Sequence, residues 1–360
     1  MVDELPDRVT KGRGAVSNRS GRFERAIRVT IDDGWVSALD DDLPPLRTTL
    51  TVDTSRSVIT YNRSPDIPFD RSINPYRGCE HGCVYCFARP THAYLGLSPG
   101  LDFETRLFHK PDAPELLVKE LRAKGYQPAP IALGTNTDPY QPVERQLQIT
   151  RRILEVLDAC NHPAGLVTKS ALVLRDVDVL SRMAARNLVH VCVSVTTLDR
   201  SLARALEPRA STPARRLDAI RQLSEAGVRV TVMASPMIPG LTDHELESIL
   251  ETAAEAGAKG AAYILLRLPL EIGDLFEEWL HAHAPDRARR VMSLIRQCRG
   301  GNLYDSQFGR RMTGDGPYAE LLRRRFHAAC NRLGLGGRSP PLDLTQFRRP
   351  EAPGDQLALF

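Results

Sequence analysis

The chain lacks the features that mark membrane and secreted proteins. Its 360 residues contain no run of eighteen apolar side chains, and a helix that crosses a bilayer needs about twenty. No apolar export segment begins the chain, and its seven cysteines are an odd number. Three of them crowd one loop, which does not fit a set of secreted disulfides. We therefore expect a cytoplasmic protein without a membrane-spanning helix.

Charge is nearly balanced over the whole chain but not along it. The formal net charge is only +4, with 42% hydrophobic and 26% charged residues. This composition suits one large core with an appendage, or two modest domains. Residues 284–338 hold twelve arginines and four acidic residues. Such a basic segment indicates either contact with nucleic acid or a solvated helical face.

Three cysteines in eight residues form the most informative motif. Cys79, Cys83 and Cys86 have the spacing CxxxCxxC within the segment NPYRGCEHGCVYCFARPTH. A structural zinc ion needs four ligands, whereas three thiolates can hold an iron-sulfur cube and leave one iron free. No fourth cysteine lies nearby, although His81 or His92 is available to complete a zinc site. The other four cysteines are predicted to be small buried residues: Cys160, Cys192, Cys298 and Cys330.

Apolar strands alternate with amphipathic helices from about residue 65 to residue 284. Counting a short strand before Cys79, the pattern gives six β/α units, too few for a closed eight-stranded barrel. Continuous apolar strands of this kind are parallel and covered by helices. The preceding residues 1–64 are predicted to be a mostly irregular arm with one or two strands within TTLTVDTSRSVITYN. Residues 285–338 read as a basic helical extension, and 339–360 as a disordered tail.

The cysteine motif, with an aromatic residue at Tyr85, resembles that of the radical S-adenosylmethionine (SAM) superfamily. The resemblance implies an α/β fold, a partial (β/α)6 TIM-type barrel. It also implies a 4Fe-4S cluster on the three cysteines, whose open iron binds SAM. Reductive cleavage of SAM there supplies a 5′-deoxyadenosyl radical, which abstracts hydrogen from substrate. An electron donor of the flavodoxin or ferredoxin type is then an expected partner.

The same resemblance assigns SAM-binding roles to polar residues at the carboxyl ends of the strands, where barrel loops converge. Gly134, Thr135 and Asn136 are candidates for the methionine amine, with a structural turn as the alternative. For the methionine carboxylate we expect Lys169, unless it is a solvated surface lysine, and Arg209.

Two further sets of residues complete the expected cofactor site. Ser194 and Thr196 are candidates for the ribose hydroxyls, since a hydroxyl both donates and accepts hydrogen bonds. Adenine is expected beside Ser235, Met237 and Ile238, which are otherwise simply core residues.

Longer motifs narrow the resemblance to the spore photoproduct lyase-like group, related to DNA repair photolyases. They are NPYRGCEHGCVYC, GTNTDPYQPVE, TKS and LEPRASTPARRL, within residues 64–334. The chain departs from true spore photoproduct lyase because GTNTD lacks that enzyme's hydrogen-donating cysteine and Phe87 replaces a tyrosine. Repair of a thymine dimer by that relay is therefore not expected. Tyr85 alone remains of the tyrosine pair, as a catalytic candidate whose default role is packing near adenine.

These features predict a radical SAM enzyme whose substrate is nucleic acid. The alternatives are radical modification of RNA or protein, and a non-enzymatic, zinc-stabilised accessory protein of the DNA clamp. The chain ends in QLALF, Gln356 to Phe360. This pentapeptide resembles the bacterial sliding-clamp-binding motif, in which a glutamine anchors the peptide and a Leu-Phe pair fills an apolar cleft.

Overall fold

The computed structural model describes residues 9–24, 26–27, 46–337 and 340–351. Its main sheet has seven strands in the order β10-β9-β8-β7-β6-β3-β2. Six of these are parallel, and only β2 runs antiparallel, beside β3. The strands are β2 (Ile59–Tyr61), β3 (Arg71–Ile73), β6 (Ile131–Leu133), β7 (Ala164–Thr168), β8 (Val189–Ser194), β9 (Val230–Met237) and β10 (Gly260–Leu265). The six parallel strands confirm the six predicted β/α units.

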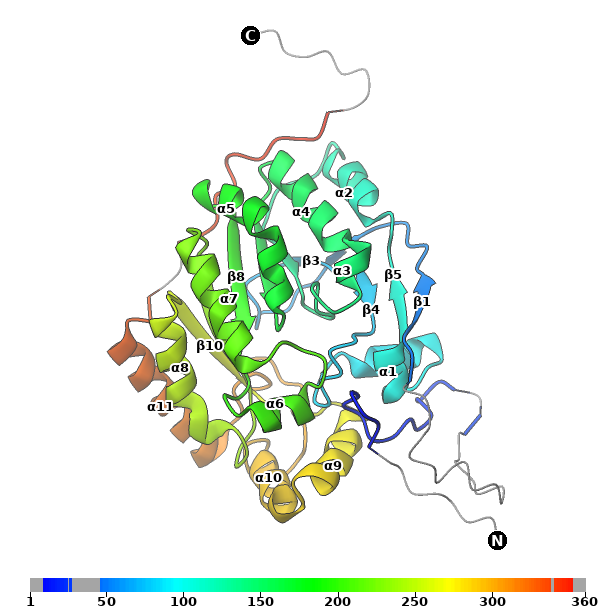
Figure 1. Cartoon of the computed structure of the whole chain (residues 1–360), viewed down its shortest axis with the longest axis vertical. Coiled ribbons are helices and arrows are strands. Elements are labelled where there is room, and N and C mark those ends of the chain that lie inside the picture. Colours follow the sequence, from blue (N-terminus) through cyan, green and yellow to red (C-terminus); the bar gives the residue numbers. More distant parts are fainter. Residues whose placement is uncertain (1–8, 25, 28–45, 338–339, 352–360) are drawn as a thin grey trace.

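Helices cover one face of this sheet (Figure 1). The helices that follow the parallel strands are α2 (Ala113–Leu121), α3 (Glu144–Leu147), α4 (Ile149–Ala159), α5 (Val177–Ala185), α6 (Arg200–Leu206), α7 (Pro213–Glu225), α8 (Leu246–Glu255) and α9 (Ile272–His283). Along β8, Val189, Val191 and Val193 are buried in the main core. His190 and Cys192 alternate with them and are only half-buried, because successive side chains of a strand point to opposite faces. The face away from the helices is therefore more accessible.

A second, three-stranded sheet stands beside the first. Its order is β1-β5-β4, where β1 is Thr49–Val52, β5 is Arg106–His109 and β4 is Tyr76–Arg77. The strands β1 and β2 lie in the segment in which the sequence predicted one or two strands, and β2 joins the main sheet. The short helix α1 (Leu101–Thr105) and the 3-10 helix η2 (Arg89–Leu95) connect β4 to β5.

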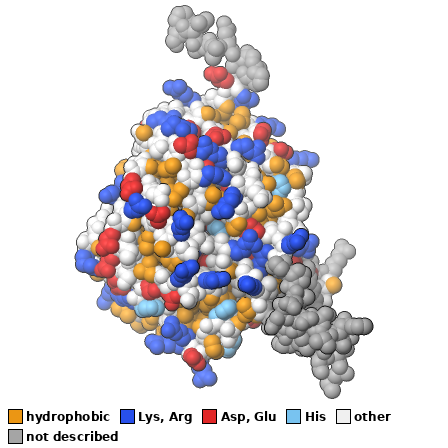
Figure 2. Space-filling model, in the orientation of Figure 1, with side chains coloured by type: hydrophobic (Ala, Val, Ile, Leu, Met, Phe, Trp, Pro, Cys, Tyr) orange, Lys and Arg blue, Asp and Glu red, His pale blue; other side chains and the backbone are white. Residues whose placement is uncertain are grey.

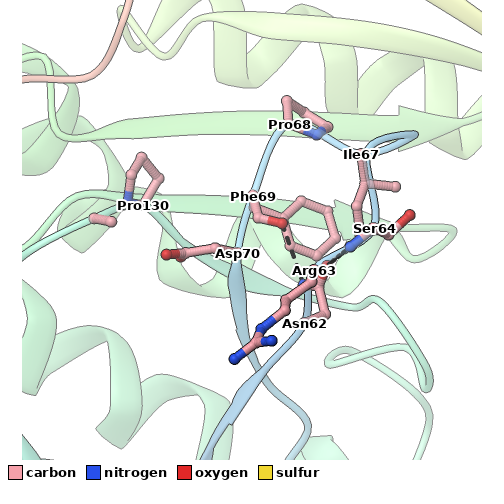
Figure 3. A pocket seen from close by; sticks show the side chains of 9 residues that line it. Asn62, Arg63, Ser64, Ile67, Pro68, Phe69, Asp70 and Pro130 are labelled. Atoms are coloured by element: carbon pink, nitrogen blue, oxygen red, sulfur yellow. Dashed lines mark hydrogen bonds between the residues drawn. The ribbon is translucent and has the colours of Figure 1, made fainter.

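The two edge strands of the main sheet, β2 and β10, do not pair with each other among the described strands. Loops bridge the gap instead. The β2–β3 loop surrounds a hollow of about 340 Å³ lined by residues 62–64, 67–70 and 129–130 (Figure 3). The same loop contains Asp66, whose carboxylate accepts a hydrogen bond from the backbone nitrogen of Gly309 (2.7 Å) and forms an ion pair with Arg311. The barrel is thus partial as a sheet and is bridged across its seam by loops.

The basic extension forms part of the barrel wall. It contains α10 (Pro285–Gln297) and α11 (Gly316–Leu333), with η4 (Asp243–Glu245) packed nearby, and Phe326 of α11 joins the main core. Arg325 pairs with Glu247 (2.6 Å) and Arg332 with Glu251 (2.5 Å), both on α8. Acidic and basic side chains are interspersed over the face in Figure 2. With Arg311, which pairs with Asp66, three arginines of the extension therefore balance acids outside it.

The C-terminal segment differs from the expected disordered tail where it is described. Residues 340–351 cross the loops that precede the parallel strands: Asp343 bonds to Asn187 (3.0 Å) and Arg348 to Cys160 (2.8 Å) through their backbones. The Phe347 ring packs with its centroid 5.4 Å from that of His162. Gln356 to Phe360 lie outside the described residues. In the part of the chain that the structure describes, no helix is long and apolar enough to cross a membrane.

Candidate active site

The three motif cysteines lie on one loop, residues 78–88, at the carboxyl end of the parallel strands. Cys79 and Cys83 are buried and Cys86 is half-buried. Burial raises the pKa of all three thiols, and their mutual repulsion as thiolates adds to this for Cys79. Positive charge nearby opposes the shift, from Lys169 for both Cys83 and Cys86. The loop therefore presents three sheltered thiols whose ionised forms need a cationic partner.

A fully buried ion pair packs against this loop and holds its backbone in place. The Arg89 guanidinium contacts the Glu104 carboxylate at 2.5 Å, and both side chains are 0% exposed. Arg89 also donates to the backbone carbonyl oxygens of Cys83 (2.8 Å) and Gly82 (3.2 Å). Its remaining donors reach the carbonyl oxygens of residues 99 and 100. One arginine thus fixes the path of the chain at the second cysteine, Cys83, and the glycine before it.

Residues 13–17, which we call the strap, close over the same loop. The backbone nitrogens of Gly14 and Ala15 donate to the two oxygens of Glu104, each at 2.9 Å. Any Cβ at position 14 would lie 1.7 Å from the Gly82 carbonyl oxygen, so only glycine permits this approach. The predicted arm is irregular here, but it is buried against the cysteine loop.

A second buried network lies where β7, β8 and β9 end. The Glu207 carboxylate is 0% exposed and accepts hydrogen bonds from Tyr85, Arg216 and Thr196, the last at 2.6 Å. Lys169 Nζ lies 3.2 Å from Glu207 and 3.1 Å from the Ser235 carbonyl oxygen. Burial lowers the pKa of Lys169 to about 8, and the Arg216 charge adds to the decrease. Two cations thus share one carboxylate, beside the cysteine loop.

The glycine loop after β6 also faces this region. Gly134 has φ +87°, and a Cβ there would meet the Val167 carbonyl oxygen at 2.0 Å, so the loop lies directly against β7. Asn74 holds the loop: its amide oxygen accepts from the Asn136 nitrogen (3.0 Å) and its amide nitrogen donates to the Thr135 hydroxyl (3.2 Å). Gly134, Thr135 and Asn136 all remain half-buried. This partial exposure leaves the loop within reach of a small ligand.

The other predicted residues fall in different surroundings. Ser194 ends β8, where its carbonyl oxygen accepts from Arg216 (3.1 Å). Arg209 pairs with Glu80 (3.2 Å), next to Cys79, whereas Lys169 pairs with Glu207. Met237 and Ile238 are fully buried in the core, Met237 with the main cluster and Ile238 with a second one beneath the cysteine loop.

Both histidines considered for zinc are engaged elsewhere. His81 Nδ1 lies 3.3 Å from Asp138, a buried carboxylate that also accepts from the Lys169 backbone nitrogen (2.7 Å). His92 Nε2 contacts the Arg106 carbonyl oxygen (2.9 Å), and burial lowers the pKa of His92. Among the described residues no three side chains of His, Cys, Asp or Glu converge on a single-ion site. The thiols of a cube bind different irons and are accordingly spread around it.

Comparison with known proteins places the chain in a family. A family model described as the Radical SAM superfamily matches residues 73–253, half of the chain. The chain belongs to the radical SAM superfamily. Uncharacterized relatives in Mycobacterium tuberculosis and Mycobacterium bovis are 36% identical over 277 residues, which is 76% of this chain and 78% of theirs. An uncharacterized protein of Methanocaldococcus jannaschii is 30% identical over 48% of this chain and 62% of its own length.

Solved structures with this fold include spore photoproduct lyase. A tyrosine-to-phenylalanine mutant of that enzyme superposes with a TM-score of 0.58 over 80% of each chain, at 17% identity. The form complexed with dinucleoside spore photoproduct gives 0.58 over 79% of each chain, at 16% identity. Identities this low show a shared radical SAM fold. The recognised family and the partial-barrel fold are thereby confirmed, and the chain is a radical SAM enzyme.

Radical SAM enzymes use a 4Fe-4S cluster and SAM, and the residues present fit both. Three thiols on one loop, two buried and one half-buried, match the cluster, and the half-buried loops after β6 and β7 lie next to them. Sequence reasoning missed three supports of this site: the Arg89–Glu104 pair, the strap, and Asp138 beneath Lys169. Asp138 stands in the quoted GTNTD motif, so its place after a strand was a usable signal. Nothing in the sequence indicated which distant residues Glu104 would meet.

Proposed function

We propose that Cys79, Cys83 and Cys86 hold the 4Fe-4S cluster, and that SAM binds beside it against the ends of β6, β7 and β8. Bound there, the cluster supplies the electron that generates the 5′-deoxyadenosyl radical. The chain's own residues would bind and orient SAM and exclude water. The substrate we propose is nucleic acid, and the reductant a small flavodoxin- or ferredoxin-like protein.

The observation that carries this proposal is the placement of Lys169. Its ammonium stands between the thiol loop and the strand ends, where Cys83 raises its pKa against the effect of burial. It shares Glu207 with Arg216, so a second anion, such as the methionine carboxylate, finds a cation already in place. Thr135 and Asn136 would accept hydrogen bonds from the methionine amine. Thr196 and Ser194 would form hydrogen bonds with the ribose hydroxyls.

The substrate class rests on charge and on the structural neighbours. Arg287, Arg289 and Arg290 on α10 are exposed, and no ion pair joins them to other described residues. By contrast Arg310, Arg311 and Arg323 to Arg325 are already paired with acids, which removes them as free phosphate ligands. One neighbouring structure holds a dinucleoside photoproduct. Phe87 and the cysteine-free loop 134–138 still separate this chain from the repair relay of that enzyme.

The first test is chemical. Anaerobically reconstituted and reduced protein is expected to convert SAM to 5′-deoxyadenosine, measured by chromatography. Cys83→Ala, which removes one thiol, should form none, while Cys160→Ala, far along the chain, should match wild type. No 5′-deoxyadenosine from wild type, or equal amounts from Cys83→Ala, would refute the proposal.

The polymer that supplies the hydrogen can be identified separately. Deuterated DNA, RNA and protein from the source cell are offered in turn, and deuterium in 5′-deoxyadenosine is measured by mass spectrometry. Transfer from DNA or RNA supports the proposal. Transfer from protein alone would replace the substrate with a polypeptide while leaving the radical chemistry intact.

A further inference from the structure

Arg267 stands unneutralised next to the proposed cluster site. It follows β10 at the carboxyl end of the sheet, and its guanidinium lies 4.7 Å from the ring centroid of Phe87, the residue after Cys86. One nitrogen, Nη1, contacts the Met312 sulfur at 3.1 Å. No carboxylate forms an ion pair with it among the described residues, and no unprinted contact supplies one. Burial lowers the pKa of Arg267, although the charge of Asp66, which pairs with Arg311, acts in the opposite direction.

A second arginine–phenylalanine pair adjoins the first. Arg311, next to Met312 in the chain, lies 4.8 Å from the ring centroid of Phe308. Asp66 and Ser64 hold this arginine from the β2–β3 loop. The backbone nitrogen of Leu265 donates to the Met312 carbonyl oxygen (2.8 Å), which fixes the segment to the end of β10. We call Phe87, Arg267, Phe308 and Arg311 the rim.

The aromatic rings of the rim are open to solvent. Phe87 is 47% exposed and Phe308 is 58% exposed, although each ring already has a guanidinium near it. In another arginine–phenylalanine pair of this chain, a carboxylate neutralises the arginine: Arg22 lies 5.4 Å from the centroid of the Phe23 ring and pairs with Glu271 at 2.6 Å. In the rim Arg311 is neutralised in the same way, but Arg267 is not. The rim therefore offers two flat apolar faces and one unpaired cation.

We propose that the rim binds an unpaired nucleotide strand, with a base stacked on Phe87 or Phe308 and a phosphodiester on Arg267. Stacking requires a base that is not inside a duplex, so the ligand is single-stranded or locally opened nucleic acid. An acidic peptide would neutralise Arg267 but would leave both aromatic faces uncovered. The inference rests on the nucleic-acid part of the proposed function and names the surface and strand state that it requires.

The test measures binding without chemistry. Fluorescein-labelled oligodeoxythymidine of about twelve nucleotides, within the site size of single-strand binders, is titrated with the full reconstituted chain and followed by anisotropy. Phe87→Ala should weaken binding about tenfold, as expected for one lost base stack. Wild type should bind an abasic oligomer of equal length about tenfold more weakly than it binds the thymidine oligomer. Phe87→Ala should lose most of that discrimination.

Salt dependence separates the charge from the stack. Arg267→Gln should reduce the slope of log affinity against log salt by about 0.7, the value for one phosphate on a single strand. Arg267→Lys keeps the charge and should restore the slope, which also shows that the site is folded. Arg221→Gln on α7 and Leu321→Ala on α11, exposed positions away from the rim, should match wild type.

Several outcomes would overturn the inference. One is that both Arg267→Gln and Phe87→Ala bind the oligonucleotide with the affinity of wild type. The others are that wild type binds no single strand, that it binds a duplex more tightly than a single strand, or that polyglutamate displaces the oligonucleotide as well as unlabelled single strand does. Formation of 5′-deoxyadenosine without oligonucleotide is measured on the same preparations. If it fails in wild type, the proposed radical function fails, whatever the rim binds; if it succeeds and the strand does not bind, only the rim inference fails.

Discussion

The two ends of the parallel sheet are closed in opposite ways. At the carboxyl end, ion pairs and hydrogen bonds surround the cysteine loop, and the Glu207 carboxylate contacts Tyr85, Lys169, Thr196 and Arg216. At the amino end, an aromatic cluster seals the strands, with the Arg71 guanidinium 5.5 Å from the centroid of the Tyr126 ring. There Tyr126 donates from its hydroxyl to His162 Nε2 (2.7 Å), and Phe347 packs against both rings.

The difference separates what each end does. A buried carboxylate shared by two cations contributes little net stability, because desolvation offsets the attraction, but it holds charge in place for a ligand. A packed aromatic cluster contributes by burial of apolar surface, and the Arg71 charge beside it is already paired with Asp70. Changes at the carboxyl end should therefore affect the cofactors most, and changes at the amino end should affect stability alone. Arg89 is the expected exception: its substitution should affect both the cofactor site and the stability of the fold.

Arg89→Met should give the largest effect and would affect both properties. It leaves the Glu104 carboxylate buried without its cation, which costs about 3–5 kcal/mol of unfolding free energy, measured by urea denaturation. The reconstituted protein should also lose iron faster in air, because the strap and the cysteine loop share this pair. The matched control is Arg332→Met, which breaks the exposed Arg332–Glu251 pair and should cost less than about 1 kcal/mol. Equal costs for the two variants would contradict the prediction.

His162 should make the amino end sensitive to acid. Burial, assisted by the Arg71 charge, lowers the pKa of His162 to about 4 from 6.5. The unfolded chain therefore takes up the proton first as pH falls, and roughly 3 kcal/mol of stability is lost between pH 6.5 and pH 4.

The measurement is the free energy of urea unfolding across that range of pH. His162→Gln should be less stable than wild type at neutral pH, but its stability should fall by less on acidification. Tyr126→Phe keeps the imidazole buried and should retain the steep fall. A His162→Gln profile parallel to that of wild type would count against the assignment.

Lys169→Met should give the smallest energetic change, confined to SAM. Loss of one charge-assisted contact weakens SAM binding about 10- to 100-fold, measured by equilibrium dialysis with anaerobically reconstituted protein. Unfolding free energy should change little, because Arg216 still neutralises Glu207. Lys259→Met, at an exposed position, serves as the control and should bind SAM as wild type does. Undiminished SAM binding by Lys169→Met would remove it from the cofactor site.

The sequence predicted the barrel well because its signals are local. Apolar runs such as VHVCVSV determine strands through side-chain alternation, and helices between them force parallel pairing. The positions of Lys169 and Thr196 followed from the same rule, since residues after parallel strands meet at one edge of the sheet. The structure indeed joins these two side chains, at 3.2 Å.

Contacts with distant partners were not indicated by the sequence. Arg209 pairs with Glu80, and its role toward the methionine carboxylate stays a prediction. The basic extension was expected to be helical, and the structure shows that α11 packs on α8 through Arg325 and Phe326. Residues 340–351 are rich in proline and charge, and they are nevertheless held by backbone hydrogen bonds and by Phe347. Composition does not reveal such contacts, because the partners lie far apart along the chain, 78 residues in the case of Arg325 and Glu247.

The sequence alone determined the family, the three thiols and the order of six β/α units, because spacing and periodicity are properties of neighbouring residues. Only the tertiary structure decided which charges are neutralised. It placed Glu104 under the strap, gave Glu207 two cations, and left Arg267 without an ion-pair partner among the described residues. Electrostatic compensation depends on distances through space, and folding sets those distances.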